Sequence, residues 1–161
     1  MRYSVRNAQP SDFSRILEIY DGARKFMAEN GNPTQWGKTN PPAQRLLKDI
    51  EEQKLYVVED TSGIHGVFFY TLGEDPTYGL IVDGRWSQDA PYGTIHRIAG
   101  DGAGGILRTA VEFAKSQCSY VRIDTHENNH VMHGGLKKLG FRRCGIIYIA
   151  DGSERIAYDL C

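Results

Sequence analysis

A glycine-rich segment from Thr94 to Leu107 carries the clearest chemical pattern in the chain. It runs from a strand-like stretch through a dense glycine turn into an amphipathic helix. Glycine permits positive φ angles and a close approach of the backbone to a ligand, and the first turn of a helix presents unpaired N–H groups with a partial positive charge. The segment therefore predicts a binding site for an anionic, phosphate-bearing cofactor.

The spacing of Gly100, Gly102, Gly104 and Gly105 narrows the kind of cofactor. No Gly-Lys-Ser/Thr ending follows these glycines, which disfavours a P-loop nucleoside triphosphatase. A dinucleotide-binding fingerprint would stand near the start of its domain, whereas most of this chain precedes the loop. Glycine clustering alone is weak evidence, and an ordinary mobile surface loop stays open as the alternative.

The composition favours one domain over residues 1–161, because a chain of 161 residues can bury a real core. Hydrophobic residues make up 40%, charged residues 24%, and the formal net charge is −1, so neither nucleic acid nor an anionic membrane surface is indicated as a partner. With no apolar export segment and no window of membrane-span length, we expect a cytoplasmic protein. Its 3 cysteines contain no Cys-x-x-Cys, which fits reduced thiols.

Hydrophobic periodicity predicts the elements that position the loop. The expected strands are 2–7, 55–59, 64–72, 94–99, 120–125, 141–149 and 155–160, and residues 78–82 could extend the sheet. Helices are expected at 12–27, at 41–53, from 106 onward, and at 129–139, where Asn129 is the N-cap and Gly140 ends the helix. The resulting order, βααβββαβαββ, implies a mixed sheet covered by helices.

This order resembles the GNAT superfamily of acyl-CoA-dependent N-acyltransferases. The glycine turn matches the family's pyrophosphate loop, commonly Gln/Arg-x-x-Gly-x-Gly/Ala, and Asn129 through Gly140-Phe141 matches its later Asn-(x)n-Gly-Phe segment. The resemblance covers nearly the whole chain. It implies a single α/β domain of the α+β mixed kind, with a central, mostly antiparallel sheet of about six to seven strands flanked by about four helices.

The resemblance also implies acetyl-CoA as cosubstrate. The pantetheine arm would follow Ile98 and Ala99, and Asn129 would belong to the cofactor site. Backbone amides would hold the pyrophosphate at Gly102, Ala103, Gly104, Gly105, Ile106 and Leu107. Here Gly100 stands in place of the usual Gln/Arg and Ala103 in place of the first motif glycine, so main-chain donors and the helix dipole would carry the binding.

Acyl transfer requires a neutral amine, yet an alkyl amine has a pKa of about 10, so a base must accept its proton. The candidates are His96 before the loop, and His126 and Glu127 at the end of the fifth strand. His96 could equally be a hydrogen-bonded core histidine. Asp124 lies on the same strand face as His126, and we expect it to pair with Arg97 or Arg122 rather than to catalyse.

Family members often place a tyrosine on the helix after the fifth strand to protonate the departing thiolate, but Leu136 holds that position here. Water or another donor such as His133 would be needed instead. A metal cluster of His126, His130 and His133 is disfavoured, because only the last two share helical spacing and no acidic ligand accompanies them. We therefore assign no metal.

On the acceptor side, family geometry places residues 26–36 and 86–92 beside the amine groove. Exposed Trp36, Trp86 and Tyr92 would form an aromatic wall for a small amine, or each ring could instead plug the outer core.

We therefore predict an N-acetyltransferase that moves an acetyl group from acetyl-CoA to a primary amine of a small molecule or peptide, by direct attack in a ternary complex. Cys118 and Cys144 fall at a helix end and in a strand, which disfavours an acyl-cysteine intermediate. The alternatives are a non-catalytic coenzyme A sensor and a purely structural domain. An exposed strand edge or the C-terminal hairpin could support a homodimer.

Overall fold

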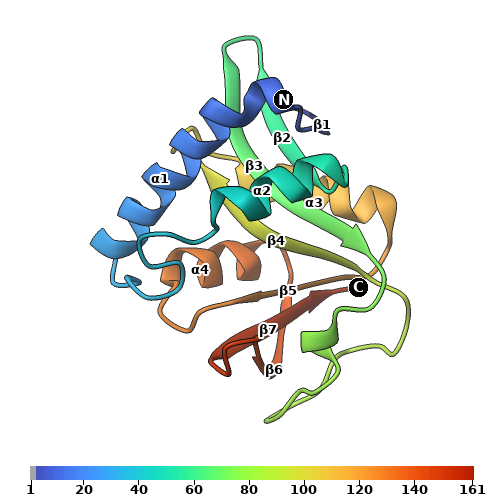
Figure 1. The fold of residues 1–161 in the computed structure, drawn as a ribbon. Coiled ribbons are helices and arrows are strands. Elements are labelled where there is room, and N and C mark those ends of the chain that lie inside the picture. The colour runs from blue at the N-terminus through green and yellow to red at the C-terminus, as the bar shows by residue number, and fades with distance from the viewer. Residues whose placement is uncertain (1–2) are drawn as a thin grey trace. The chain divides into compact units, whose positions relative to one another are not determined.

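The computed structural model describes residues 3–161, and its elements follow the predicted order βααβββαβαββ (Figure 1). The strands are β1 (Ser4–Asn7), β2 (Leu55–Asp60), β3 (Gly63–Leu72), β4 (Gly93–Gly100), β5 (Val121–Thr125), β6 (Arg142–Tyr148) and β7 (Glu154–Leu160). The helices are α1 (Phe13–Glu29), α2 (Ala43–Glu51), α3 (Ile106–Gln117) and α4 (His130–Lys138), with short 3-10 turns η1 (Pro10–Asp12) and η2 (Pro76–Tyr78).

Hydrogen bonding joins the strands into a 7-stranded sheet in the order β1-β2-β3-β4-β5-β7-β6. The pairs β1/β2, β2/β3, β5/β7 and β6/β7 are antiparallel, and β4 pairs with β5 in parallel at Gly93 and Thr94. The predicted mixed, mostly antiparallel sheet is therefore confirmed.

Residues 78–82, which could have extended the sheet, add one bridge and no full strand. Tyr78 completes the turn η2, and Val82 bridges to Ile146 of β6. The cause is local, because the Asp75 carboxylate accepts both the N–H and the hydroxyl of Thr77 at 2.9 and 2.7 Å, and Pro76 fixes the first turn position.

The chain forms two compact units. The first unit contains the residues up to Tyr70 together with His96–Phe113. The second unit contains Thr71–Ile95 and Ala114–Cys161. Among the described residues no helix combines the length and the apolar character needed to cross a membrane.

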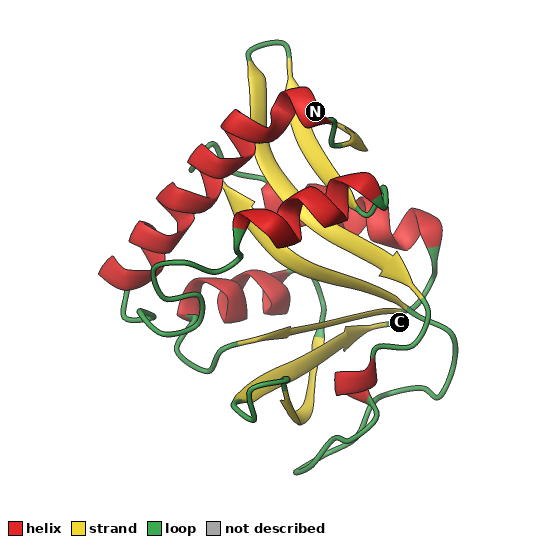
Figure 2. Cartoon of the chain, in the orientation of Figure 1, coloured by secondary structure: helices red, strands yellow, loops and turns green. Residues whose placement is uncertain are grey.

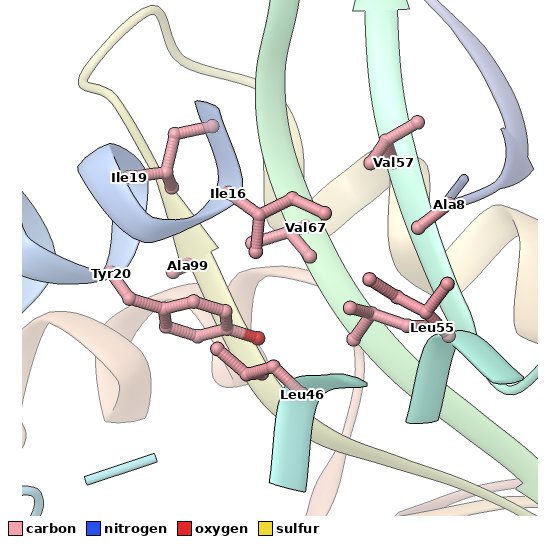
Figure 3. Close-up of a cluster of buried hydrophobic side chains, with 10 residues drawn as sticks. Ala8, Ile16, Ile19, Tyr20, Leu46, Leu55, Val57, Val67 and Ala99 are labelled. Atoms are coloured by element: carbon pink, nitrogen blue, oxygen red, sulfur yellow. The ribbon is translucent and has the colours of Figure 1, made fainter. Parts of the chain in front are cut away.

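In the first unit, one face of β2 and β3 packs against α1 and α2 (Figure 3). Helical spacing turns Ile16, Ile19 and Tyr20 of α1 into this core, and strand alternation adds Leu55 and Val57 of β2. Leu46 of α2 completes the cluster, which holds α1 and α2 against the sheet.

The opposite face of the same strands packs against α3, so helices lie on both sides of β2 and β3 (Figure 2). Phe113 of α3 contacts the rings of Tyr56, Phe68 and Tyr70 at centroid distances of 4.7, 5.7 and 5.6 Å. These residues alternate with the members of the first core, as the period of a strand requires. The packing fixes α3, and with it the glycine loop that precedes this helix.

The second unit has its own core around the β6–β7 hairpin, which was correctly predicted. Its buried members are Tyr78, Tyr92, Tyr120, Cys144, Ile147 and Ala157. The helix α4 begins where the sequence predicts, because the Asn129 side chain accepts the Met132 N–H at 3.1 Å. It ends at Lys138, and the chain turns away at Gly140, whose φ of 91° is the left-handed conformation that glycine adopts readily.

Candidate functional site

The predicted phosphate-binding loop is an exposed turn between β4 and α3. Gly102, Gly104 and Gly105 have φ angles of 93°, 88° and 77°, so this backbone path depends on glycine. The Gly104 carbonyl accepts the Tyr3 hydroxyl at 2.8 Å, and the Gly105 carbonyl accepts the Thr109 N–H at 3.0 Å. Hydrogen bonds within the first unit therefore hold both carbonyl groups in place.

The backbone amides of this loop are available to bind an anion. Within residues 3–161, no acceptor occupies the N–H groups of Gly104, Gly105 or Ile106, and the first two of these residues are exposed. Ile106 begins α3, whose N-terminal end carries partial positive charge. Loop and helix start together therefore have the donors and the field that phosphate binding requires.

Two glycines outside the turn let α3 approach the sheet closely. A Cβ at Gly66 of β3 would lie 2.5 Å from Ile106 Cγ2, and one at Gly100 would lie 3.0 Å from Ile106 Cγ1. Because Ile106 is only 7% exposed, a longer side chain at either position would displace the first residue of α3. Packing thus accounts for Gly100 at the place where the family commonly has Gln or Arg.

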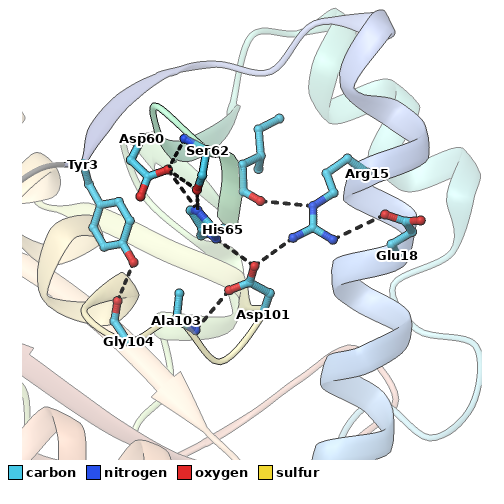
Figure 4. A network of polar contacts seen from close by, with 10 residues as sticks. Tyr3, Arg15, Glu18, Asp60, Ser62, His65, Asp101, Ala103 and Gly104 are labelled. Atoms are coloured by element: carbon cyan, nitrogen blue, oxygen red, sulfur yellow. Dashed lines mark hydrogen bonds and ion pairs between the residues drawn. The ribbon is translucent and has the colours of Figure 1, made fainter.

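A polar network holds the loop in place (Figure 4). The sequence did not predict this network. Asp101 accepts the Ala103 N–H at 3.0 Å, Arg15 Nη2 at 2.8 Å, and His65 Nδ1 at 2.8 Å. Partial burial acts to raise the pKa of Asp101, but the contacts with His65, Ala103 and Arg15 prevail and lower it. One predicted pyrophosphate donor, the Ala103 amide, is therefore already used by the protein.

The strand that leads into the loop contains a backbone irregularity. Arg97 has a φ of 53°, a left-handed conformation that costs a non-glycine residue about 1–2 kcal/mol. Three contacts hold it there: its carbonyl accepts the Tyr20 hydroxyl at 2.5 Å, its guanidinium pairs with Asp49 at 3.0 Å, and its Cζ lies 4.3 Å from the Phe69 ring centroid. This strained conformation lies just before Ile98 and Ala99, where the pantetheine arm is predicted to bind.

The three candidate bases occupy different surroundings. His96, in the first unit, is half-buried beside the Phe69 ring at a centroid distance of 5.9 Å. Glu127, in the second unit, is exposed just after β5. His126 is half-buried, and its Nδ1 accepts the Asn128 N–H at 3.0 Å, which places the remaining ring proton on Nε2. Burial and the nearby Arg155 charge lower the pKa of His126, so the ring is neutral at pH 7.

The start of α4 holds His133 firmly. Its Nε2 lies 3.2 Å from the carbonyl oxygens of both His126 and Glu127, so this nitrogen carries a proton. Its Nδ1 then accepts the Tyr158 hydroxyl at 2.6 Å. Both ring nitrogens are thus engaged in structural contacts, which argues against His133 as the thiolate donor. Leu136, at the family's tyrosine position, is fully buried.

The predicted aromatic wall is only partly exposed. Trp36 is half-buried and packs on the Tyr20 ring at 5.5 Å, which anchors the loop after α1. Trp86 is half-buried, and Tyr92 is only 6% exposed, which contradicts the expectation that it is exposed. These last two rings lie 4.2 and 4.1 Å from the Arg122 guanidinium, a buried cation that draws them inward.

The predicted partners of Asp124 are also different. Its carboxylate accepts the Tyr78 hydroxyl at 2.7 Å, while Arg97 pairs with Asp49.

Burial raises the pKa of the Cys144 thiol to about 12, so this cysteine is a poor nucleophile at neutral pH. The first unit thus brings together the glycine loop, Ile98 and Ala99, and the second unit contains His126, Glu127 and Asn129.

Solved structures with the same fold are acetyltransferases. An acetyltransferase of the GNAT family from Streptococcus agalactiae 2603 is 28% identical, with a TM-score of 0.88, and the match covers 98% of this chain and 94% of that chain. A ribosomal-protein-alanine N-acetyltransferase from Brucella melitensis is 16% identical, with a TM-score of 0.63 and 98% of each chain covered. A NatC complex bound to Gag peptide and CoA is 12% identical, with a TM-score of 0.64, and the match covers 99% of this chain and 98% of that chain.

The sequence matches no protein-family model and no curated protein. The fold and the likeness to the streptococcal enzyme nevertheless define the class, which is that of the acyl-CoA-dependent acetyltransferases. The chain belongs to the GNAT superfamily, as its glycine loop and its Asn129–Phe141 segment predicted.

Proposed function

We propose that this protein transfers an acetyl group from acetyl-CoA to a primary amine of a small molecule or peptide, by direct attack in a ternary complex. The observation that carries the proposal is the exposed glycine loop, whose Gly104, Gly105 and Ile106 amides point to no acceptor among residues 3–161 and stand at the start of α3. The CoA bound to the structurally similar NatC complex supports the choice of cosubstrate.

In this proposal the loop amides bind the pyrophosphate, and the backbone of Ile98 and Ala99 orients the pantetheine arm. The amine nitrogen attacks the thioester carbonyl, the new C–N bond forms, and the C–S bond breaks to release the thiolate. The amine proton passes to a base of the protein. In this proposal the acetyl group passes directly from the thioester to the amine, with no acyl-cysteine intermediate.

Glu127 is the favoured base. Its side chain is exposed just after β5, whereas the Nδ1 lone pair of His126 already accepts the Asn128 N–H. His96 is the second candidate, as a half-buried imidazole on β4. General base catalysis contributes about 10²–10⁴-fold to a rate, so loss of the true base is readily measured.

The test is an amine screen with acetyl-CoA, in which release of the CoA thiol and formation of the acetylated amine are both followed. For an accepted amine, initial rates at varied concentrations of both substrates should give intersecting lines, whereas parallel lines would indicate an acyl-enzyme and refute direct transfer. Glu127→Gln should lower kcat about 10²-fold or more and flatten its pH profile, with exposed Glu51→Gln as the control. If Glu127→Gln leaves the profile unchanged while His96→Gln flattens it, His96 is the base.

A non-catalytic coenzyme A sensor is the second candidate function. Fully buried Leu136 at the family's tyrosine position, and the engaged ring nitrogens of His133, favour it. A sensor would bind acetyl-CoA but release no CoA thiol with any amine of the screen.

A further inference from the structure

The network beside the glycine loop joins three segments of the first unit that are distant in sequence. His65 lies on β3, Asp60 lies at the end of β2, and Asp101 begins the loop after β4. His65 Nδ1 is 2.8 Å from Asp101 Oδ2, and His65 Nε2 is 3.0 Å from Asp60 Oδ1. One imidazole therefore bridges two carboxylates (Figure 4).

The hydrogen-bond pattern fixes the protonation of this imidazole. Ser62 donates its hydroxyl proton to Asp60 Oδ1 at 2.6 Å, so its oxygen can only accept from His65 Nε2, which lies 2.7 Å away. Asp101 and Asp60 are acceptors as well when ionised. Each ring nitrogen thus faces acceptors only, and both nitrogens must carry a proton.

The distances from Ser62 to His65 and from His65 to Asp101 match the connectivity of a Ser-His-Asp hydrolase triad. The direction of the hydrogen bonds does not, because the hydroxyl proton of Ser62 goes to Asp60 and not to the imidazole. A doubly protonated His65 cannot accept a proton from a nucleophile. The network therefore has a different role.

We propose, on the basis of the proposed function, that His65 is a positioning residue for coenzyme A: as an imidazolium it holds Asp101, and through Asp101 it holds the loop that binds the pyrophosphate. Asp101 connects the two directly, since its Oδ1 accepts the Ala103 N–H at 3.0 Å and its own N–H donates to the His65 carbonyl at 2.9 Å. The imidazolium also offsets the negative charge that Asp101 places beside an anionic ligand.

The other charged and titratable groups around His65 are accounted for. On the α1 side, Arg15 contacts Asp101 at 2.8 Å and is itself paired with Glu18 at 3.3 Å. On the β1 side, the Tyr3 ring lies 6.0 Å from the imidazole. The contacts with Asp101 and then Asp60 raise the pKa of His65, although partial burial acts against them.

This arrangement makes acetyl-CoA binding depend on pH with a defined sign. Because the folded-state pKa of His65 is raised, the bridge is complete at acidic to neutral pH and is lost as the pH rises through that raised pKa. Loss of the proton removes one donor from the bridge and leaves the Asp101 charge less neutralised. Both effects weaken the binding of an anion.

The experiment is calorimetric titration with acetyl-CoA between about pH 6.5 and 8.5, a range above most of the titration of the ligand's own phosphate. For the wild type we expect the Kd to rise about fivefold across this range, which corresponds to about 1 kcal/mol. His65→Gln should bind with the weak, high-pH affinity throughout. His130→Gln, which removes an exposed histidine of the second unit, should behave as the wild type.

Asp60→Asn separates positioning from a merely structural role. It keeps an acceptor for Nε2 but removes one carboxylate charge, so the midpoint of the pH dependence should move to lower pH while the affinity at acidic pH is retained. NMR titration of the His65 ring should show the same displacement in the absence of ligand. Circular dichroism of each variant checks folding, and Asp60→Asn alone decides the matter if His65→Gln does not fold.

The outcomes separate the two proposals. If the wild type binds acetyl-CoA but its pH dependence is unchanged in His65→Gln and in Asp60→Asn, the role of His65 is refuted and the proposed function stands. If His65 titrates as an ordinary histidine, the bridge is refuted whether or not ligand binds. If the wild type does not bind acetyl-CoA at any pH, while the NMR titration gives a raised pKa for His65, the proposed function fails instead.

Discussion

Replacement of Gly104 by alanine tests whether the left-handed backbone of the loop serves ligand binding. Gly104 has a φ of 88°, and no atom lies within 4 Å of the position that a Cβ would take. The substitution therefore introduces backbone strain without a steric clash. The cost of a non-glycine residue in this conformation is about 1–2 kcal/mol.

Gly152, in the β6–β7 turn of the second unit, provides a matched control. Its φ is 85°, and a Cβ there also meets nothing within 4 Å. Alanine at either position should change the free energy of unfolding by less than about 1–2 kcal/mol, because alanine also lowers the entropy of the unfolded chain.

The two variants should differ in their binding of acetyl-CoA. In Gly104→Ala the exposed loop can relieve its strain by leaving the native conformation, and binding must then restore that conformation. Titration calorimetry should show a Kd about 5–30-fold higher than that of the wild type, the equivalent of about 1–2 kcal/mol. Gly152→Ala should bind as the wild type does. Equal weakening in both variants, or unchanged affinity in Gly104→Ala, would refute the reasoning.

Two further predictions concern the second unit. Asp159 is 1% exposed and accepts the Ser87 N–H and the Tyr120 hydroxyl, each at 2.7 Å, so Asp159→Asn should lower the free energy of unfolding by about 1–3 kcal/mol in urea denaturation. Burial acts to raise the pKa of Asp159, but the hydrogen bonds from Tyr120 and Ser87 prevail and lower it. The stability that this carboxylate contributes should therefore be lost as the pH falls through the lowered pKa. The same acid dependence of unfolding in the wild type and in Asp159→Asn would contradict this prediction. Iodoacetamide at mildly alkaline pH should label exposed Cys161 and spare buried Cys144, as measured by mass spectrometry of the folded protein. Equal labelling of the two cysteines would show that the Cys144 thiol is accessible.

The sequence predicted the elements well because their causes are local. Asn129 caps α4 and Gly140 ends it through contacts within a few residues, and the alternation of Leu55, Tyr56 and Val57 reads directly as a strand with two covered faces. The same local reasoning located the glycine loop. Such features need only the period of an element and the properties of its end residues.

The contacts that refine the site depend on tertiary pairing and were not predictable in the same way. Several charged residues could have paired with Asp124, and only the fold decides that Tyr78 does so while Arg97 pairs with Asp49. His65 and Asp101 are 36 residues apart and carried no motif. The burial of Tyr92 follows from the buried Arg122 cation, which its sequence neighbours do not reveal.

We predict that the loop from Gly102 to Leu107 binds the pyrophosphate of acetyl-CoA. Isothermal titration of the wild type with acetyl-CoA, free CoA and pantetheine tests it most directly, because only pantetheine lacks the pyrophosphate. We predict micromolar binding of the first two ligands and a large loss of affinity for the third. Equal affinity for all three, or no binding of acetyl-CoA at millimolar concentration, would contradict the assignment and leave the segment an ordinary surface turn.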